Sequence, residues 1–278
     1  MSRRVLIAGC GDVGTAAGLA LARSGWAVTG LRRNVAAIPD PIRGLSVDLL
    51  DPASLDTVAG AWDALIYCPT PVERSEAGYR AIFVDGLRNV LKKVTAARLL
   101  FVSSTAVYGQ NDGSVVDEAS VTEPAGFNGR ILLEAEAVAH AGAAEPVAVR
   151  FGGIYGPGRE RLLRVASRGP ANEVVAVPPQ WTNRMHREDC GATLAWLTEL
   201  AAPERCYNGV DDASVPRHEV LAWIAETLGV QGPTLTRGDG GSQGKRVSNA
   251  RLRASGFACR YPDYRAGYGP MIAAWSGP

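Results

Sequence analysis

The sequence has little of the material that builds disulfide frameworks, metal centres and membrane spans. Its five cysteines are scattered without a Cys-x-x-Cys pair, and its three histidines, His140, His186 and His218, lie far apart. These absences indicate free thiols, a cytoplasmic protein and no metal site. No apolar run approaches the ~20 residues of a membrane span, and Asp12 interrupts the first run.

The chain also lacks an excess of charge of either sign. Its formal net charge is +1 over 278 residues, and acidic and basic side chains are interspersed. This balance indicates neither nucleic acid nor an anionic membrane as a partner, so we expect a small-molecule substrate. The length suits one large domain, or one domain with a smaller lobe.

The first half of the chain alternates short, continuous apolar runs with helical segments. Such runs are typical of strands that are buried on both faces of a parallel sheet. The pattern predicts an α/β fold with a Rossmann-type, doubly wound parallel sheet. The predicted strands are Arg4–Ala8, Ala27–Leu31, Leu45–Asp48, Ala64–Cys68, Leu99–Ser103 and Val147–Phe151. The predicted helices between them span residues 12–25, 52–61, 73–96 and 128–142.

The pattern loosens after Gly152, which indicates a small, discontinuous C-terminal substrate lobe. A strand within residues 205–210 is predicted to return to the main sheet. We therefore expect a nucleotide-binding domain at residues 1–155 plus about 186–212. The substrate lobe would take residues from about 156 to 185 and from 213 to 278.

Three glycines in AGCGDVG, Gly9, Gly11 and Gly14, spell Gly-x-Gly-x-x-Gly. The motif directly follows the first predicted strand and opens a helix, which is the context that dinucleotide binding requires. The first glycine allows a tight turn, the second lets the backbone approach a pyrophosphate, and the third lets helix and strand pack. The helix start at Asp12 and Val13 would offer backbone N–H groups to the phosphates. The alternative is a glycine turn that binds nothing.

The end of the second predicted strand, VTGLRRN, has no acidic residue. An NAD site usually places a carboxylate there, about 20 residues after the glycines, to hold the ribose 2′-hydroxyl. Arg32 and Arg33 stand in its place, and a guanidinium group suits a 2′-phosphate. NADP is therefore favoured over NAD, unless the two arginines only belong to a solvated loop.

Seven segments together resemble the extended short-chain dehydrogenase/reductase superfamily, in its NAD-dependent epimerase/dehydratase branch. They are AGCGDVG, VDLLD, YRAIFVDGLRN, FVSSTAVYG, VRFGGIYGPG, NRMHREDCGATLAWL and YNGVDDASV, and the resemblance that they carry extends over most of the chain. The resemblance implies a Rossmann sheet with a carboxyl-terminal substrate lobe. Members often dimerise through the helices that follow the fourth and fifth strands, which leaves a homodimer open.

The resemblance also assigns residues to the cofactor and the substrate. Along the cofactor it places Asp48 and Leu49, near the adenine, together with Cys68, Pro69, Thr70 and Ser103. Ser104, four residues before Tyr108, takes the position that orients the substrate oxygen. Tyr108, Asn183 and Arg184 are the candidate substrate contacts.

One part of the family pattern, Tyr-x-x-x-Lys, is absent from the chain. In the family this tyrosine is the acid/base, and the lysine lowers its pKa. If Glu134 is aligned with the acidic residue of the family helix, Gly126 takes the tyrosine position and Arg130 the lysine position. Arg130 can hold ribose hydroxyls, but its guanidinium group stays protonated. A surface pair with Glu134 is the alternative role.

The residue that moves a proton is left open by the sequence. Tyr155, in GGIYGPG, comes at the end of the sixth predicted strand region, shortly after Phe151, where the family faces the nicotinamide and the substrate. His186 can titrate near neutral pH. A packing role for Tyr108, which the family usually gives to the tyrosine of VYG, and a loop-holding role for His186 are the alternatives.

Two basic segments of the second half are candidates for binding an anion. Arg161, Arg164 and Arg168 share a helical face by their spacing, which would hold an anionic substrate or simply be solvated. The loop Gly238–Gly244 would act as a lid over a bound anion or as a plain connector.

Three functions follow from these features. The leading one is an NAD(P)-dependent oxidoreductase acting on a small, sugar-like or phosphorylated substrate. A nucleotide-sugar epimerase or dehydratase is the second, and the lost tyrosine counts against it. The third is a catalytically silent NADP-binding sensor or regulatory protein.

Overall fold

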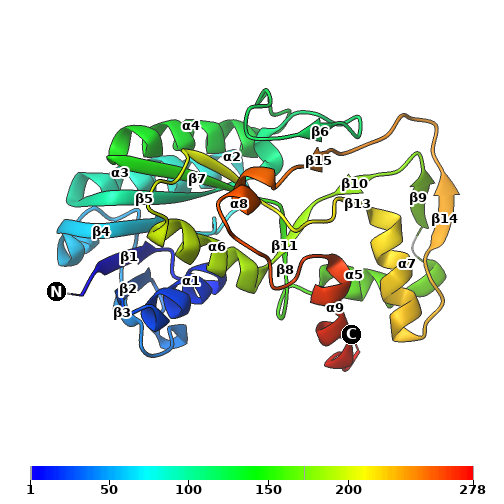
Figure 1. Cartoon of the computed structure of the whole chain (residues 1–278), viewed down its shortest axis with the longest axis horizontal. Coiled ribbons are helices and arrows are strands. Elements are labelled where there is room, and N and C mark those ends of the chain that lie inside the picture. The colour runs from blue at the N-terminus through cyan, green and yellow to red at the C-terminus, as the bar shows by residue number, and fades with distance from the viewer. Residues whose placement is uncertain (1, 172, 278) are drawn as a thin grey trace. The chain divides into compact units, whose positions relative to one another are not determined.

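The central sheet has seven strands in the order β12-β7-β5-β4-β1-β2-β3 (Figure 1). The computed structural model describes residues 2–171 and 173–277. The strands of the sheet are β1 (Arg4–Ala8), β2 (Ala27–Arg32), β3 (Arg43–Ser46), β4 (Gly60–Tyr67), β5 (Val94–Ser104), β7 (Glu145–Phe151) and β12 (Cys206–Gly209). All the pairings from β3 across to β7 are parallel. The predicted fold class is confirmed, and residues 206–209 join the main sheet as predicted.

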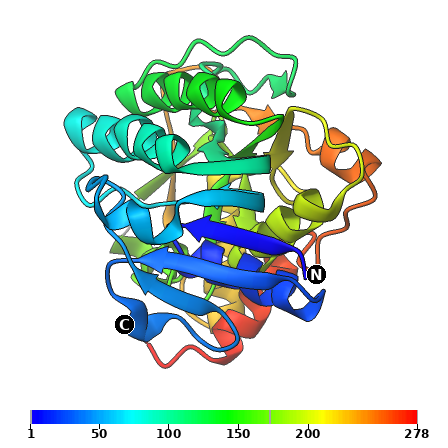
Figure 2. The ribbon, with the colours of Figure 1, turned by 90° about the vertical axis from the view of Figure 1, so that its left-hand side faces the viewer.

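Helices cover both faces of this sheet, which explains why its strands are continuously apolar. In Figure 2, α3 and α4 lie on one face, and α1 and α6 lie on the other. These helices are α1 (Asp12–Arg23), α3 (Gly86–Lys93), α4 (Phe127–Gly142) and α6 (Arg187–Glu199). Residues 5–8 of β1 are fully buried between the two layers. Gly191 lets α6 pack closely on α1, because a Cβ there would lie 2.5 Å from the Cβ of Ala16.

Three of the predicted helices end earlier than expected, and α1 does so by only two residues, at Arg23. The segment predicted as a helix over residues 73–96 consists of α2 (Glu76–Arg80), a π-helical stretch and α3, and it ends at Lys93. Val94 and Thr95 belong to β5, where they pair with β4, because β-branched residues fit a sheet position better than a helix end. Between β3 and β4 only a 3₁₀ helix forms, at Ser54–Val58.

The chain divides into two units by its internal contacts. The first unit extends to Tyr108 and also contains Thr122–Phe151 and Cys190–Tyr207. The second contains Gly109–Val121, Gly152–Asp189 and the chain from Asn208 onward. The predicted division placed residues 109–121, 152–155, 186–189 and 208–212 in the nucleotide-binding domain, whereas they lie in the second unit. Residues 109–121 belong to the second unit because β6 (Val115–Val116) pairs with β15 (Arg246–Val247).

The second unit combines short strand pairs with a small helical core. Its other strands are β8 (Gly153–Tyr155), β9 (Glu173–Val177), β10 (Trp181–Thr182), β11 (Arg184–His186), β13 (Val215–Pro216) and β14 (Thr234–Arg237). Its helices are α5 (Arg161–Ala166), α7 (Arg217–Leu228), α8 (Ala250–Ala254) and α9 (Tyr264–Ala273). Leu163, Ile224 and Tyr268 form part of the core between α5, α7 and α9. Because α5 ends at Ala166, Arg168 lies beyond the helix on which it was expected.

No helix in the described part of the chain combines the length and the apolar character needed to cross a membrane.

Candidate functional site

The three glycines between β1 and α1 meet different surroundings. Gly9 has a φ of +89°, and a Cβ there would lie 2.5 Å from backbone atoms of Pro69. A Cβ on Gly14 would lie 2.9 Å from the Gly9 carbonyl oxygen. A Cβ on Gly11 would meet only that same oxygen, at 4.0 Å. Gly9 and Gly14 therefore serve the packing of the loop, whereas the open space beside Gly11 is where a ligand can approach the backbone.

The amino end of α1 faces this open space with its backbone. Gly11 is the N-cap of α1 and forms no side-chain capping bond. The N–H groups of the first turn, at Asp12 and Val13, are at the positive end of the helix dipole. Val13 is buried, so its backbone is the part of it that could contact a ligand. The loop and the helix end together fit the pyrophosphate of a dinucleotide.

Two arginines at the end of β2 lie beside the glycine loop. The N–H groups of Gly9 and Cys10 donate to the Leu31 carbonyl oxygen at 3.2 and 2.9 Å, which ties the loop to this strand. Arg32 is half-buried and Arg33 is exposed. Within residues 2–171 and 173–277 neither guanidinium group has an ion-pair partner, so both are available to a phosphate. Burial raises the pKa of the Cys10 thiol, although the nearby positive charge of Arg32 acts to lower this pKa.

The other residues expected along the cofactor follow β3 and β4. Asp48 is exposed, and its Oδ1 accepts the Leu50 N–H at 3.0 Å, whereas Leu49 is buried. The Cys68 thiol donates to the Gly9 carbonyl oxygen at 3.3 Å, and burial raises its pKa. Cys68 is therefore a neutral packing residue under the glycine loop. Thr70 is exposed one residue after Pro69.

Ser104 ends β5 and begins a 3₁₀ turn at Thr105–Val107. Its Oγ accepts the Ala106 N–H at 3.1 Å. A serine hydroxyl has one hydrogen to donate as well as lone pairs to accept. Because the capping bond occupies only a lone pair, the hydroxyl hydrogen stays available for a substrate oxygen.

A buried ion pair anchors both ends of the Ser104 turn. Arg150 donates to both carboxylate oxygens of Glu136, through Nε at 3.0 Å and Nη2 at 2.7 Å. Before the turn, the Ser103 hydroxyl donates to Glu136 Oε1 at 2.5 Å. After the turn, Arg150 Nη1 donates to the Tyr108 hydroxyl oxygen at 3.0 Å. Burial alone would lower the pKa of Arg150, but Glu136 raises it above its usual value.

This ion pair was not found by sequence reasoning. The sequence feature that could have indicated it is Glu136, a glutamate at a core-facing position of the predicted helix. It lies two residues after Glu134, which was aligned with the family. Ser103 and Tyr108 were expected to touch cofactor and substrate, and those contacts stay predictions. Both hydroxyls are engaged inside the protein, where they position Ser104.

The start of α4 packs against the Ser104 turn. A Cβ on Gly129 would lie 2.5 Å from the Ala106 carbonyl oxygen, so the helix end and the turn are in close contact. Arg130 is exposed, and its Nη1 donates to the Ala125 carbonyl oxygen at 3.0 Å. The structure thus brings together the segments of Ser104 and Arg130, as the resemblance implies.

The surface pair considered for Arg130 does not form within the described residues. Glu134 instead contacts Arg80 at 2.8 Å and Arg88 at 3.8 Å. The reason is that α4 runs beside α2 and α3, whose arginines reach Glu134 from the neighbouring helices.

Tyr155 and His186 lie in the second unit, at paired positions of β8 and β11. The Tyr155 ring stacks on Tyr268, with the centroids 4.5 Å apart, and its hydroxyl donates to the Asp263 carbonyl oxygen at 3.4 Å. Burial raises the pKa of Tyr155 well above its usual value, so the phenol is no base at neutral pH. His186 is buried against Tyr261, and its Nδ1 accepts the Glu188 N–H at 3.3 Å. Their catalytic roles stay predictions.

The second unit also contains a cavity of about 450 Å³ beside β8, β10 and β11. Asn183 and Arg184, the predicted substrate contacts, both line it. Asn183 is largely engaged inside the protein: its Oδ1 accepts from Ser214 and Val247, and its Nδ2 donates to the Lys245 carbonyl oxygen at 2.8 Å. Arg184 is the member of this pair with a donor to spare.

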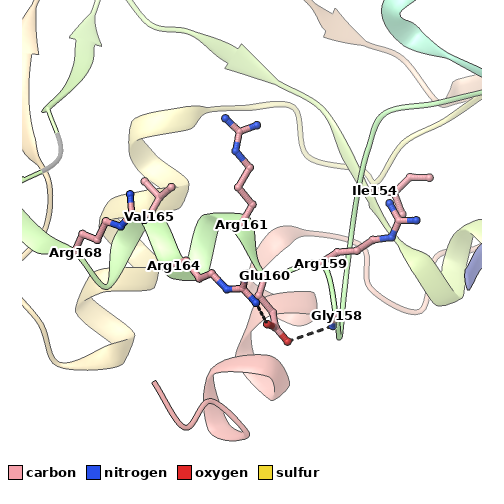
Figure 3. Close-up of a pocket in the computed structure, with 8 residues that line it drawn as sticks. All are labelled: Ile154, Gly158, Arg159, Glu160, Arg161, Arg164, Val165 and Arg168. Carbon is pink, nitrogen blue, oxygen red and sulfur yellow. Dashed lines mark hydrogen bonds and ion pairs between the residues drawn. The ribbon is translucent and has the colours of Figure 1, made fainter. Parts of the chain in front are cut away.

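A neighbouring cavity of about 540 Å³ is formed around α5 (Figure 3). Arg164 and Arg168 line this cavity, whereas Arg161 lines both cavities. The carboxylate of Glu160 accepts from Arg164 at 3.2 Å. Figure 3 shows Arg161 extending away from Glu160. The predicted basic face is thus divided, because one of its arginines is neutralised by its own helix neighbour.

The fold and the glycine loop define a member of a known family. The chain matches the NAD dependent epimerase/dehydratase family over residues 5–199, and it belongs to this family.

Similar proteins cover nearly the whole chain. A solved structure from Methylobacillus flagellatus, assigned by name to NAD-dependent epimerases/dehydratases, has 36% identity and a TM-score of 0.83, over 99% of each chain. A conserved protein of unknown function from Silicibacter pomeroyi DSS has 29% identity and a TM-score of 0.76, over 99% of this chain and 100% of its own. Protein YeeZ of Escherichia coli K12 is 26% identical, over 94% of this chain and 97% of its own length.

The glycine loop predicts opposite outcomes for two alanine substitutions. Gly9→Ala is expected to lower the free energy of unfolding by on the order of 1–3 kcal/mol, because its φ is positive and Pro69 is in contact. Gly11→Ala is expected to change it by less than about 0.5 kcal/mol. Urea denaturation measures both, and equal losses would contradict the different surroundings of the two glycines.

The buried ion pair predicts a large loss of stability when one partner is neutralised. Glu136→Gln leaves the Arg150 charge unpaired, so the free energy of unfolding is expected to fall by about 3–5 kcal/mol. Glu134→Gln, on the same helix but in an exposed pair, is the matched control and should cost less than about 1 kcal/mol. Similar losses for the two variants in chemical denaturation would show that the Glu136 pair does not anchor the turn.

Proposed function

We propose that this protein is an NADP-dependent oxidoreductase of the extended short-chain dehydrogenase/reductase type, acting on a small, sugar-like or phosphorylated substrate. The observation that carries the proposal is the pair of uncommitted guanidinium groups, Arg32 and Arg33, beside a glycine loop that is open at Gly11. Arginine gives bidentate hydrogen bonds to phosphate oxygens and is always charged.

The cofactor would be held by three parts of the first unit. The amino end of α1 and the loop at Gly11 would bind the pyrophosphate, and Arg32 and Arg33 would bind the 2′-phosphate. Asp48 and Leu49, which follow β3, would border the adenine. When bound, NADP supplies or accepts the hydride.

The reacting oxygen of the substrate would be bound by Ser104. Its hydroxyl hydrogen is free to be donated while its Oγ caps the following turn. The Glu136–Arg150 pair would keep this hydroxyl in one position, because it holds the residues before and after the turn. Arg130 would add positive charge at the start of α4, which favours an oxygen that gains negative charge during reduction.

A second candidate function is a catalytically silent NADP-binding protein that senses or regulates. The observation in its favour lies at the start of α4, where Gly126 is the N-cap and Arg130 is an exposed side chain. This segment offers no phenol and no amine for proton transfer. Both candidate functions include NADP binding, so only a measurement of enzymatic turnover distinguishes them.

The two arginines predict a preference for NADPH over NADH. Fluorescence titration should show tighter binding of NADPH to the wild type, and Arg32→Gln with Arg33→Gln should weaken NADPH binding by about 10–100-fold. The same double variant should bind NADH nearly as the wild type does. Arg43→Gln, an exposed arginine on β3, is the control for a general loss of positive charge. Equal affinities of the wild type for the two cofactors would refute the 2′-phosphate role.

If Ser104 binds the reacting oxygen, turnover should depend on its hydroxyl group. In a screen of NADPH oxidation with carbonyl compounds and sugar nucleotides, Ser104→Ala should lower turnover by about 10²-fold. Ser104→Thr, which keeps a hydroxyl, should retain more of it. If no compound is turned over by the wild type, but Gly126→Tyr with Arg130→Lys produces activity, the silent candidate is correct. Gly126 has a φ of −92°, so a tyrosine is compatible with its backbone.

A further inference from the structure

A cavity of about 410 Å³ lies at the amino ends of β7 and β12 in the first unit. One of its walls is the end of α4 with the start of β7, and the other is the loop between α6 and β12. Most of its lining is alanine, proline and valine, and its polar lining residues are His140, Glu145 and Arg205. The volume is in the range of small-molecule sites, roughly 300–1,000 Å³.

This cavity is at the opposite edge of the sheet from the glycine loop and Ser104. β5 and β7 run in parallel, with Arg98 beside Glu145 at one end and Ser104 beside Phe151 at the other. The six residue steps between these two pairs span about 20 Å. A ligand in the cavity therefore cannot contact a substrate oxygen at Ser104, and it would be a second ligand of the first unit.

A buried arginine fixes the carboxylate of the first wall. Arg98 is 9% exposed, and its Nε and Nη2 donate to Glu145 Oε2 at 2.9 and 2.5 Å. Its Nη1 donates to the carbonyl oxygens of Leu197, Thr198 and Leu200, at the negative end of α6. Glu145 Oε1 has no hydrogen-bond partner within the described residues. Because both bonds from Arg98 use the other oxygen, Oε1 can accept from a ligand.

His140 supplies a second acceptor on the same wall. Its Nε2 lies 3.2 Å from the Arg205 carbonyl oxygen, which also accepts the Ala148 N–H at 2.9 Å. A carbonyl oxygen only accepts, so Nε2 is the nitrogen that carries the hydrogen. In the neutral imidazole Nδ1 is then an acceptor.

Arg205 is the cation of the opposite wall. Its side chain is exposed, and its guanidinium group has no ion-pair or hydrogen-bond partner in residues 2–171 and 173–277. Its backbone is held in place, because its carbonyl oxygen accepts from both His140 and Ala148. A guanidinium group binds a carboxylate through two parallel hydrogen bonds. The cavity thus offers two acceptors on one wall and a paired donor on the other.

A free α-amino acid has the complementary groups. Its ammonium group can donate to Glu145 Oε1 and His140 Nδ1, while its carboxylate accepts from Arg205. The alanine, proline and valine lining has no side-chain hydrogen-bonding group, so it suits an apolar side chain. A simple anion would leave the acceptors of Glu145 and His140 unused, and a simple amine would leave Arg205 unused.

We propose that this cavity binds a free α-amino acid with an apolar side chain, its ammonium group on Glu145 and His140 and its carboxylate on Arg205. The amino acid is neither the cofactor nor the substrate of the proposed function, because it binds at the other edge of the sheet. The proposal therefore stands independently of that function.

Calorimetric titration of the full-length protein with matched ligands tests the two charged contacts. L-Leucine has both charged groups, L-leucinamide lacks the carboxylate, and 4-methylpentanoate lacks the ammonium group. L-Leucine should bind at least about tenfold more tightly than either of the other two, because each of them loses a charge-assisted hydrogen bond. Glycine should bind more weakly than L-leucine, since it has no apolar side chain.

Two substitutions should remove the two contacts separately. Arg205→Gln should weaken L-leucine binding by about tenfold or more and leave L-leucinamide binding nearly unchanged. Glu145→Gln should weaken L-leucine binding to a similar extent without weakening the binding of 4-methylpentanoate. Glu204→Gln, an exposed neighbour outside the cavity lining, and Arg23→Gln, exposed at the end of α1, are the matched controls and should leave L-leucine binding unchanged.

A third variant covers the case in which Glu145→Gln does not fold, since that change also removes the ion pair with Arg98. Ala202→Leu keeps every charge and fills part of the cavity, so it should weaken L-leucine binding as well. Chemical denaturation checks that each variant is folded.

Several results would overturn the proposal. Equal binding of L-leucine and L-leucinamide would remove the role of Arg205, and equal binding of L-leucine and 4-methylpentanoate would remove that of Glu145 and His140. Failure of both L-leucine and L-phenylalanine to bind with a Kd below about 10 mM would overturn the site itself. NADPH is titrated separately, and its failure to bind would overturn only the proposed function.

Discussion

The site in the first unit depends on the common direction of its neighbouring strands. Because the pairings from β3 across to β7 are all parallel, the carboxyl ends of these strands meet at one edge of the sheet. The glycine loop follows β1, Arg32 ends β2, Cys68 follows β4 and Ser104 ends β5. Segments far apart in sequence are thereby gathered at one edge, which is where open α/β sheets bind their ligands.

The buried charged residues of this protein are of two kinds, those whose hydrogen bonds are satisfied and those that keep an unpaired donor. Glu136 and Arg150 satisfy each other at two oxygens and also bind the hydroxyls of Ser103 and Tyr108. Such a satisfied network holds one arrangement of the chain. Arg184 is equally buried but keeps an unpaired donor at a cavity. An unsatisfied buried donor of this kind is a cost to the fold.

Much of the fold could be predicted because it depends on local patterns. β1 has the predicted bounds, and β2, β5 and β7 contain the strands predicted for them, since a strand buried on both faces must be apolar throughout. The misplaced residues lie at ends of elements: Val94 and Thr95 were assigned to a helix but pair with β4. Whether a β-branched residue at such a boundary joins the helix or the strand is decided by pairing with the neighbouring strand. The local sequence does not contain that information.

The sequence by itself determined the class of the fold, the glycine loop and the presence of arginines where NAD sites have a carboxylate. These features depend on residue type and short spacing, which are read along the chain. Only the tertiary structure decided that Glu136, rather than Glu134, is the buried acid of α4, because the packing of α4 on β5 and β7 selects the side of the helix that is enclosed. It also decided that both lone-pair sides of the Asn183 amide oxygen are used, by Ser214 and Val247, while one buried donor of Arg184 is not, since these partners come from segments distant in sequence. Residue types and their spacing can be read from the sequence, whereas the hydrogen-bond partners of a side chain depend on its surroundings in the folded protein.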